Sequence, residues 1–166
     1  MPSEPLLDLS AIDLNHPVET REGIARYNPH RGQMALLDAV VWHSDDLLKG
    51  VGLWRVRSDE FWVPGHIPGD PLMPGVLMVE AGAQLASYMY YKKAQVDWFA
   101  GFARIEDCSF RGRVVPGDDF YLLCDVTKFG LKRFNANVQG IARGQIAFDA
   151  SITGLAFPKM GTVSRT

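Results

Sequence analysis

The sequence has few cysteines, and their spacing excludes a disulfide framework and a zinc site. Cys108 and Cys124 are the only two in 166 residues, and two thiols without CxxC spacing can build neither. We expect both to be reduced residues of the core, where free cysteines are usually found. The histidines lack a metal-ligand spacing to one another or to carboxylates. The sequence therefore predicts no metal site and no other cofactor.

Charge of one sign and long apolar runs are also scarce. Lys plus Arg number 17 and Asp plus Glu 19, so the net charge is −2, and nothing favours attraction to nucleic-acid phosphates. The longest apolar stretch, 76–91, is interrupted by Glu80 and Gln84 and is shorter than the roughly 20 residues of a membrane span. The N-terminus carries Glu4 and Asp8 where a secretory signal needs basic residues. These features predict a cytoplasmic protein that binds neither nucleic acid nor a membrane.

Length and composition fit one globular domain. Hydrophobic residues make up 47% and charged residues 22% of the chain, which is close to the globular average. No internal repeat and no linker rich in Gly, Ser or Pro divides it. Residues 1–27 differ from the rest because they are polar and interrupted by Pro2, Pro5 and Pro17. We expect them to form an N-terminal extension packed on the outside, and residues 28–166 to form a single domain.

Runs of apolar, β-branched and aromatic residues predict an antiparallel sheet. The runs 35–43 and 47–57 flank the polar pair Asp45 and Asp46, a pattern typical of a hairpin. Residues 97–157 alternate similar runs with turn signals. They predict at least four more strands.

A loop and one long helix lie between the predicted hairpin and the later strands. Residues 58–74 hold four prolines, which exclude regular structure there. Pro74 suits the first turn of a helix, and residues 75–93 continue without proline to Lys92 and Lys93, which complement the negative end of the helix dipole. Because apolar side chains surround this helix on nearly every side, it can be buried only if the sheet curls around it. The expected architecture is α+β, the hotdog fold, in which a curled antiparallel β-sheet wraps a long central helix.

The segment 65–84, GHIPGDPLMPGVLMVEAGAQ, contains residues that packing alone does not explain. Glu80 lies on an otherwise apolar helix, where a carboxylate is costly unless it is paired or protonated. Burial favours the protonated form, which would make Glu80 a proton donor near neutral pH. The alternative is that Glu80 lies on an exposed strip beside Gln84, one turn away.

Two further features of this segment fit the chemistry of proton transfer. His66 lies in the Pro-rich loop, which fixes the direction of its side chain, and a neutral imidazole there is a good general base. The amides of Gly75 and Val76 begin the helix without an intrahelical acceptor and form a natural oxyanion site. The simpler interpretations are a loop histidine that binds nearby carbonyls and a Pro-Gly pair that only starts a helix. A base, an acid and an oxyanion donor together are what β-elimination of water next to a carbonyl requires.

This segment resembles that of the FabZ-type β-hydroxyacyl-acyl carrier protein dehydratase family. The family's loop and helix read approximately GHFPGxPxMPGVLxxEAxAQ, and this chain has Ile67 where phenylalanine is usual. Two further blocks, NPHRGQMALLDAV (28–40) and FRGRVVPGDDFYL (110–122), are similar to the family's LPHRxPFLLVDRV and FRxPVxPGDxL. The resemblance spans about residues 28–157.

The resemblance implies a role for each candidate residue. His66 would act as the base at C2 of the acyl thioester, Glu80 would act at the hydroxyl, directly or through water, and Gly75 would offer its amide to the thioester carbonyl. In the family, two subunits pair helix against helix so that the histidine of one faces the acidic residue of the other. These homodimers commonly assemble into hexamers, as trimers of dimers. Because position 80 is Glu, as in the FabZ branch, the double-bond isomerisation of FabA is not expected.

The substrate suggests two further sets of residues. An acyl chain is apolar and must be kept from water, and our candidates for the wall of its tunnel are Met73, Leu77 and Phe102, each of which is equally explained as a core residue. The expected partner is an acyl carrier protein, which is acidic in the systems that this family serves, so docking needs a local basic patch. Scattered solvated charges are the alternative. The candidates for the patch are Arg104, Arg111, Arg113, Lys132 and Arg133.

Two other functions stay open at this point. An acyl thioesterase of the same fold would use Glu80, or a water that it activates, at the thioester carbon and would release a free thiol. A non-catalytic protein that binds acyl thioesters would keep the fold without turnover. The joint presence of His66, Gly75 and Glu80 argues against the second.

Overall fold

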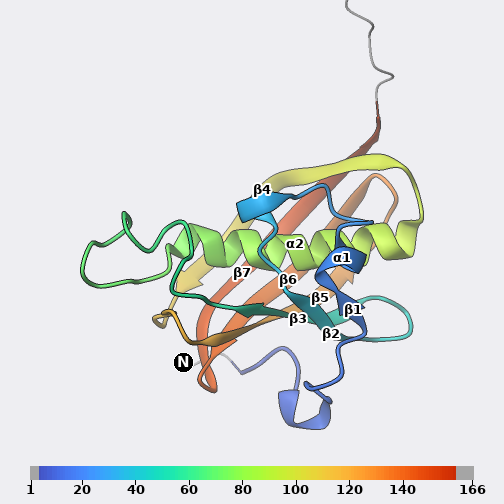
Figure 1. The fold of residues 1–166 in the computed structure, drawn as a ribbon. Coiled ribbons are helices and arrows are strands. Elements are labelled where there is room, and N and C mark those ends of the chain that lie inside the picture. The colour runs from blue at the N-terminus through green and yellow to red at the C-terminus, as the bar shows by residue number, and fades with distance from the viewer. Residues whose placement is uncertain (1–3, 160–166) are drawn as a thin grey trace, which may run out of the picture.

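A long helix lies across a curled antiparallel sheet in the computed structural model, which describes residues 4–159 (Figure 1). The helix is α2 (Gly75–Ala94), and the sheet of these residues has the strand order β1-β2-β3-β5-β6-β7-β4. The strands are β1 (Glu19–Thr20), β2 (Ala39–His43), β3 (Lys49–Arg55), β4 (Trp98–Phe110), β5 (Asp119–Lys128), β6 (Arg133–Ala142) and β7 (Gln145–Pro158). None of the helices in the described part of the chain has the length and hydropathy to cross a membrane. The predicted α+β hotdog fold is confirmed.

The helix α2 begins and ends within one residue of its predicted bounds, because both ends carry clear signals. Pro74 precedes it, and the chain leaves it at Gln95, whose left-handed backbone (φ 51°) lets its amide donate to the Tyr91 carbonyl at 3.0 Å. Most of its side chains are buried against the sheet. One stripe stays at least partly exposed, with members three and four residues apart: Val76, Glu80, Ala83 and Ser87. The sheet therefore wraps the helix except along this stripe.

The first strand of the predicted hairpin begins later than predicted. β2 starts at Ala39 rather than at residue 35. The preceding backbone bonds to side chains instead of to a strand, because the Ala35 carbonyl accepts from Arg21 at 2.6 Å and the Leu36 amide donates to Gln84 at 3.1 Å. The segment before β2 is thus tied to both the N-terminal residues and the helix.

The remaining elements follow in the predicted order, and one strand, β3, also begins later than predicted. β3 starts at Lys49 rather than at residue 47, since Leu47 has a left-handed backbone (φ 57°) in the hairpin turn. The loop over 58–74 contains no helix or strand, as predicted. The four further strands expected over 97–157 are β4 to β7.

The N-terminal residues cover the outer face of the sheet, on the side away from α2 (Figure 1). Gln139 of β6 holds them, accepting from the Leu6 amide at 2.7 Å and donating to the Glu4 carbonyl at 3.1 Å. The chain then adds β1 and a short helix, α1 (Arg21–Ile24), to the edge of the sheet. The sequence did not predict β1 or α1, because elements this short show no hydrophobic periodicity. Residues 1–3 of the predicted N-terminal extension and residues 160–166 of the predicted domain lie outside the described residues. The side chains that pack on the outer face are Leu6, Leu7, Leu9, Ile12 and Leu14.

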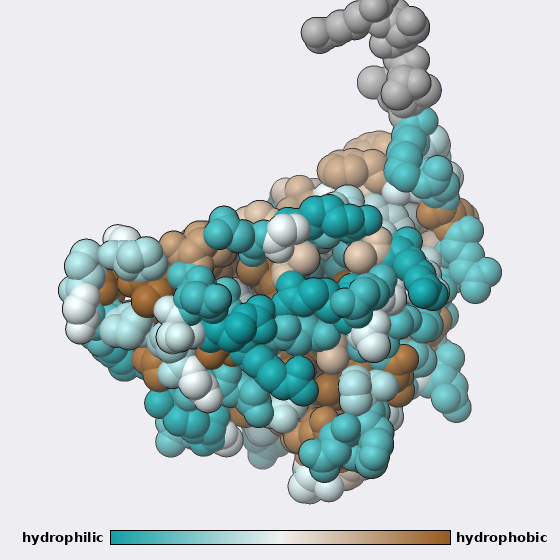
Figure 2. Space-filling model, in the orientation of Figure 1, coloured by the Kyte–Doolittle hydropathy of each residue, from teal (hydrophilic) through white to brown (hydrophobic). Residues whose placement is uncertain are grey.

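Strand β4 is an edge strand that is hydrophobic although most of it is exposed. It pairs with β7 alone among the described strands, and hydrophobic side chains show between hydrophilic ones on the space-filling surface (Figure 2). Cys108 on this strand is exposed, so the prediction that it is a core residue is wrong, because no helix or strand within residues 4–159 covers that edge. Cys124 on β5 is buried as predicted. An exposed hydrophobic edge strand is typical of a surface that binds a partner. Its exposed large hydrophobic residues are Phe99, Phe102, Ile105 and Phe110.

Candidate active site

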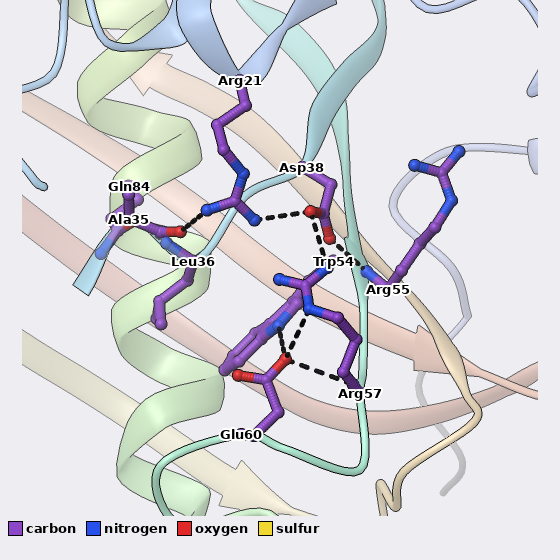
Figure 3. A network of polar contacts seen from close by, with 9 residues as sticks. All are labelled: Arg21, Ala35, Leu36, Asp38, Trp54, Arg55, Arg57, Glu60 and Gln84. Carbon is purple, nitrogen blue, oxygen red and sulfur yellow. Dashed lines mark hydrogen bonds and ion pairs between the residues drawn. The ribbon is translucent and has the colours of Figure 1, made fainter. Parts of the chain in front are cut away.

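The loop that carries His66 is fixed to the sheet where it begins, by a network of polar contacts (Figure 3). Glu60 accepts from the Trp54 indole nitrogen at 2.9 Å and from the Arg57 amide at 3.2 Å. The Arg57 guanidinium donates to Asp38 at 3.1 Å. Because Trp54 is a core residue of β3, these bonds anchor the first turn of the loop to the interior of the protein.

Asp38 is the centre of this network and remains ionised. Its side chain is only 11% exposed, and it accepts from Arg21 at 2.5 Å as well as from the Arg55 amide at 2.7 Å. Burial alone would raise the pKa of the carboxyl, but the bonds from Arg21, Arg55 and Arg57 outweigh burial and hold that pKa below its ordinary 3.8. The Asp38 carboxylate is thus paired with the charged groups of Arg21 and Arg57.

His66 is exposed, and one backbone carbonyl decides its chemistry. Its amide donates to the Trp62 carbonyl at 2.9 Å, and its ring Nδ1 lies 2.7 Å from the Leu72 carbonyl oxygen. A carbonyl oxygen can only accept, so Nδ1 carries the proton of the neutral ring and Nε2 is left with a free lone pair. The simpler interpretation, a loop histidine that binds a nearby carbonyl, is therefore correct as far as the Nδ1 contact goes. The same contact leaves Nε2 able to take up a proton.

The start of α2 offers the two amides that the sequence singled out. Neither the Gly75 nor the Val76 amide has an acceptor among the described residues, and the Val76 side chain is 72% exposed. The ring of Phe110 lies over Gly75, where an added Cβ would come within 2.8 Å of it. The amides are thus free to bind an oxygen, and the absence of a side chain at Gly75 makes room for Phe110 of β4.

Glu80 is half-buried and is held by a glutamine whose orientation is unambiguous. Gln84, only 2% exposed, accepts from the Leu36 amide at 3.1 Å through Oε1. Since a backbone amide can only donate, Nε2 of Gln84 must be the atom that faces the Met34 carbonyl at 2.7 Å and Glu80 Oε1 at 2.9 Å. The alternative that Glu80 and Gln84 form an exposed strip is therefore wrong for Gln84, because its side chain is buried. A buried donor therefore fixes one oxygen of the Glu80 carboxylate.

The other side of Glu80 opens into a cavity between α2 and the sheet. Phe102 of β4 lines it together with Phe134 of β6 and Ile152 of β7, so its wall opposite the carboxylate is mostly apolar. His66 does not line this cavity. Within one chain, Glu80 and Phe102 thus line the same cavity. His66, the candidate base, lies outside it, in the loop that precedes α2.

The remaining predicted tunnel and docking residues are dispersed. Met73 is buried in the core and Leu77 packs against it, and neither lines the cavity beside Glu80. Three of the five basic candidates have an acidic partner, whereas Lys132 and Arg133 have no ion pair within residues 4–159. The pairs are Arg104 with Glu106 (3.1 Å), Arg111 with Asp149 (2.5 Å) and Arg113 with Asp70.

Two further residues, which the sequence did not single out, lie beside Glu80 and Gln84. His30 Nε2 lies 3.4 Å from Glu80 Oε1, and buried Asn28 donates to the Gln84 carbonyl at 2.8 Å. In the described range no three His, Cys, Asp or Glu side chains are grouped to hold a metal ion. The signal that could have found both residues is the polar start, Asn-Pro-His-Arg, of the block 28–40.

The sequence model of the FabA-like domain matches residues 28–152. The chain is a member of the FabA-like family. Among its relatives, the 3-hydroxyacyl-[acyl-carrier-protein] dehydratase FabZ of Aromatoleum aromaticum is 38% identical over 136 residues, which are 78% of this chain and 92% of the relative. The same enzyme of Exiguobacterium sibiricum is 36% identical over 139 residues, 81% of this chain and 96% of the relative. The resemblance to FabZ dehydratases is confirmed.

Solved structures share the fold of this FabA-like chain. The dehydratase heterocomplex ApeI:P from Xenorhabdus doucetiae matches with a TM-score of 0.70 at 18% identity and covers 82% of this chain and 91% of that one. A hypothetical thioesterase from Streptococcus pneumoniae, solved with coenzyme A, matches with a TM-score of 0.55 at 10% identity and covers 72% and 84%. At these identities the likeness concerns the fold alone, which dehydratases and thioesterases share.

Proposed function

We propose that this FabA-like protein dehydrates (3R)-hydroxyacyl-acyl carrier protein to trans-2-enoyl-acyl carrier protein in fatty acid biosynthesis. The observation that carries the proposal is the 2.7 Å contact of His66 Nδ1 with the Leu72 carbonyl, which leaves Nε2 as a base. The names of relatives at 36–38% identity support the reaction.

Each group has one task in the proposed reaction. His66 Nε2 takes the proton from C2 of the acyl thioester, and the amides of Gly75 and Val76 bind the thioester oxygen as negative charge develops on it. Glu80 gives a proton to the hydroxyl at C3, which leaves as water. No redox change occurs, so these groups suffice without a cofactor.

The base and the acid come from different subunits of a homodimer in this proposal. Two surfaces that the described residues leave at least partly exposed support it: the hydrophobic edge strand β4, and the stripe of α2 that contains Val76, Glu80, Ala83 and Ser87. A second copy that covers both surfaces would bury them and could bring its own His66 loop to the Glu80 cavity. Assembly of such dimers into hexamers stays a prediction from the sequence, as does a cytoplasmic location.

Hydration of a short trans-2-enoyl thioester tests the reaction in reverse. We expect the wild type to remove the enoyl absorbance, and both His66→Ala and Glu80→Gln to slow it at least about 100-fold, the scale that acid–base catalysis contributes. Thiol release is followed in the same cuvette. Thiol release by the wild type without hydration would make the protein a thioesterase, and binding without either reaction would make it a non-catalytic acyl-thioester protein.

Mixing the two inactive variants tests the shared site. If His66 of one subunit works with Glu80 of the other, a mixed dimer has one intact site, and random exchange of subunits restores about a quarter of the wild-type rate. If both residues work within one subunit, no site is intact and mixing restores nothing. The oligomeric state of each variant, measured by light scattering, serves as the control.

Substrate recognition is proposed for the residues left available by the fold. We place the acyl chain in the apolar cavity beside Glu80, with Phe102 in its wall. For carrier-protein docking, Lys132 and Arg133 are the stronger candidates, because Arg104, Arg111 and Arg113 are paired with acidic residues. The charge reversals Lys132→Glu and Arg133→Glu should raise KM for carrier-protein thioesters and leave KM for coenzyme A thioesters unchanged.

A further inference from the structure

His30 lies beside the proposed acid and is unused in the reaction described above. Its ring is half-buried, and Nε2 lies 3.4 Å from Glu80 Oε1, the same oxygen to which Gln84 donates. Its other ring nitrogen, Nδ1, is buried and has no partner among the described residues. Oε1 of Glu80 thus has two possible donors, Gln84 and His30. Of the two ring nitrogens of His30, only Nε2 contacts a charged group.

The surroundings of His30 decide where its proton lies. A proton on Nδ1 would be a buried donor without an acceptor, which is costly, and would turn the lone pair of Nε2 toward a carboxylate oxygen. A proton on Nε2 avoids both problems and points a donor at Glu80 Oε1. The neutral ring therefore favours the Nε2–H form.

The ring is also kept neutral by its environment. Burial lowers the pKa of His30, the charge of Glu80 opposes this, and Arg31 lowers the pKa further, so that the net direction is below the ordinary 6.5. Arg21 and Glu22 line a second cavity that adjoins the same ring. Among these groups, Glu80 on α2 is the one that Nε2 contacts.

We propose that His30 is a positioning residue that, together with Gln84, donates to Glu80 Oε1 and so assigns the catalytic proton to Oε2. This rests on the proposed dehydration. An oxygen that already accepts from two donors is the carbonyl oxygen of the protonated acid, so the acidic hydrogen lies on the other oxygen. At 3.4 Å the contact from His30 is longer than an ordinary hydrogen bond, and such contacts often tighten only when substrate binds.

The proton balance follows from this assignment. The C2 proton moves to His66 Nε2, and the Oε2 proton leaves with the C3 hydroxyl as water. Glu80 becomes a carboxylate while Gln84 and His30 keep their own protons and continue to donate to Oε1. Hydrogen bonds to an ionised acceptor are stronger than those to a neutral one. Both donors therefore stabilise the transition state more than the ground state.

Nitrogen NMR of the resting protein tests the proton position without any turnover. The His30 ring signals are assigned by their loss in His30→Gln. We expect a neutral ring protonated on Nε2 throughout the neutral pH range. A charged imidazolium, or a neutral ring protonated on Nδ1, would overturn the proposal, because in either state His30 does not act as a neutral Nε2–H donor to Glu80.

Kinetics of two substitutions test the role. His30→Leu removes the donor, and should lower kcat about tenfold or more at unchanged KM, which is the effect of one hydrogen bond to a charged group. His30→Gln keeps an N–H donor and should recover most of kcat. His43→Gln, on β2 with its ring contacting the Ser44 carbonyl, is the matched control.

The outcomes separate this proposal from the proposed function. A wild type that does not hydrate enoyl thioesters overturns the function, and NMR still decides the state of His30. An active wild type whose His30→Leu variant keeps the same kcat overturns the positioning role. So does equal loss in His30→Leu and His30→Gln with a lowered melting temperature, which indicates a role in folding alone.

Discussion

The two halves of the proposed site are built in opposite ways. The base, His66, is an exposed loop residue whose ring contacts one backbone carbonyl. The acid, Glu80, lies on a helix and is held by Gln84, a buried side chain that also bonds to two backbone groups.

The difference follows from the chemistry that each half performs. A neutral histidine needs only its tautomer fixed, and one carbonyl does this wherever the loop lies. A carboxyl that must give up a proton needs a defined free oxygen, so its other oxygen has to be held by rigid donors. The base half should therefore respond to changes of loop backbone, and the acid half to loss of buried hydrogen bonds.

The largest effect is expected on the acid half. Gln84→Leu leaves the buried Leu36 amide and the partly buried Met34 carbonyl without their partner, which should lower the free energy of unfolding by about 2–4 kcal/mol. Denaturant unfolding measures the loss. Gln139→Leu is the matched control, because this glutamine is also buried but bonds only to the N-terminal residues. Equal losses of enoyl hydration in the two folded variants would contradict the assignment of Gln84 to the site.

The network around Asp38, which anchors the loop, should make the free energy of unfolding depend on pH. Asp38→Asn should lower the free energy of unfolding by about 1–3 kcal/mol at neutral pH, because Asn cannot serve both guanidinium groups as a charged acceptor. The folded pKa of Asp38 lies below its ordinary 3.8, so the stabilisation is complete above that value and is lost as the pH falls through the folded value. Urea unfolding over a pH series checks this.

The difference between wild type and Asp38→Asn should therefore shrink in acid. A difference that stays constant below pH 3.8 would show that the variant loses packing and not a charge. Asp45→Asn, in the exposed hairpin turn, is the control for the general effect of removing one carboxyl.

A smaller effect is expected in the loop of the base. Gly69 has a left-handed backbone (φ 81°) in open space, so Gly69→Ala introduces backbone strain of about 1 kcal/mol and no clash. Because this turn precedes Leu72, whose carbonyl fixes His66, the hydration rate should fall with stability. Gly65→Ala is the matched control, since Gly65 also lies in open space but lacks a positive φ. Loss of rate in Gly65→Ala alone would break the argument from backbone conformation.

The sequence predicted the fold and the candidate base and acid, because these carry local signals. Pro74 and the apolar run after it define α2, and alternating strands define the sheet. The exposure of Cys108 was not predictable, since whether an edge strand is covered depends on the order of strands in the sheet. The contact of His30 with Glu80 was not predictable for a similar reason, because fifty residues separate the two and only the fold joins them.

The smallest effect is expected for the ion pair that links the loop of the base to Arg113. Asp70 and Arg113 are about half exposed, and such pairs contribute about 0–1 kcal/mol because water and salt screen them. Asp70→Asn should leave the melting temperature and the hydration rate nearly unchanged, and added salt should act equally on variant and wild type. A large loss of rate would mean that the loop is held by this charge and not by its backbone, which would reverse the contrast between the two halves of the site.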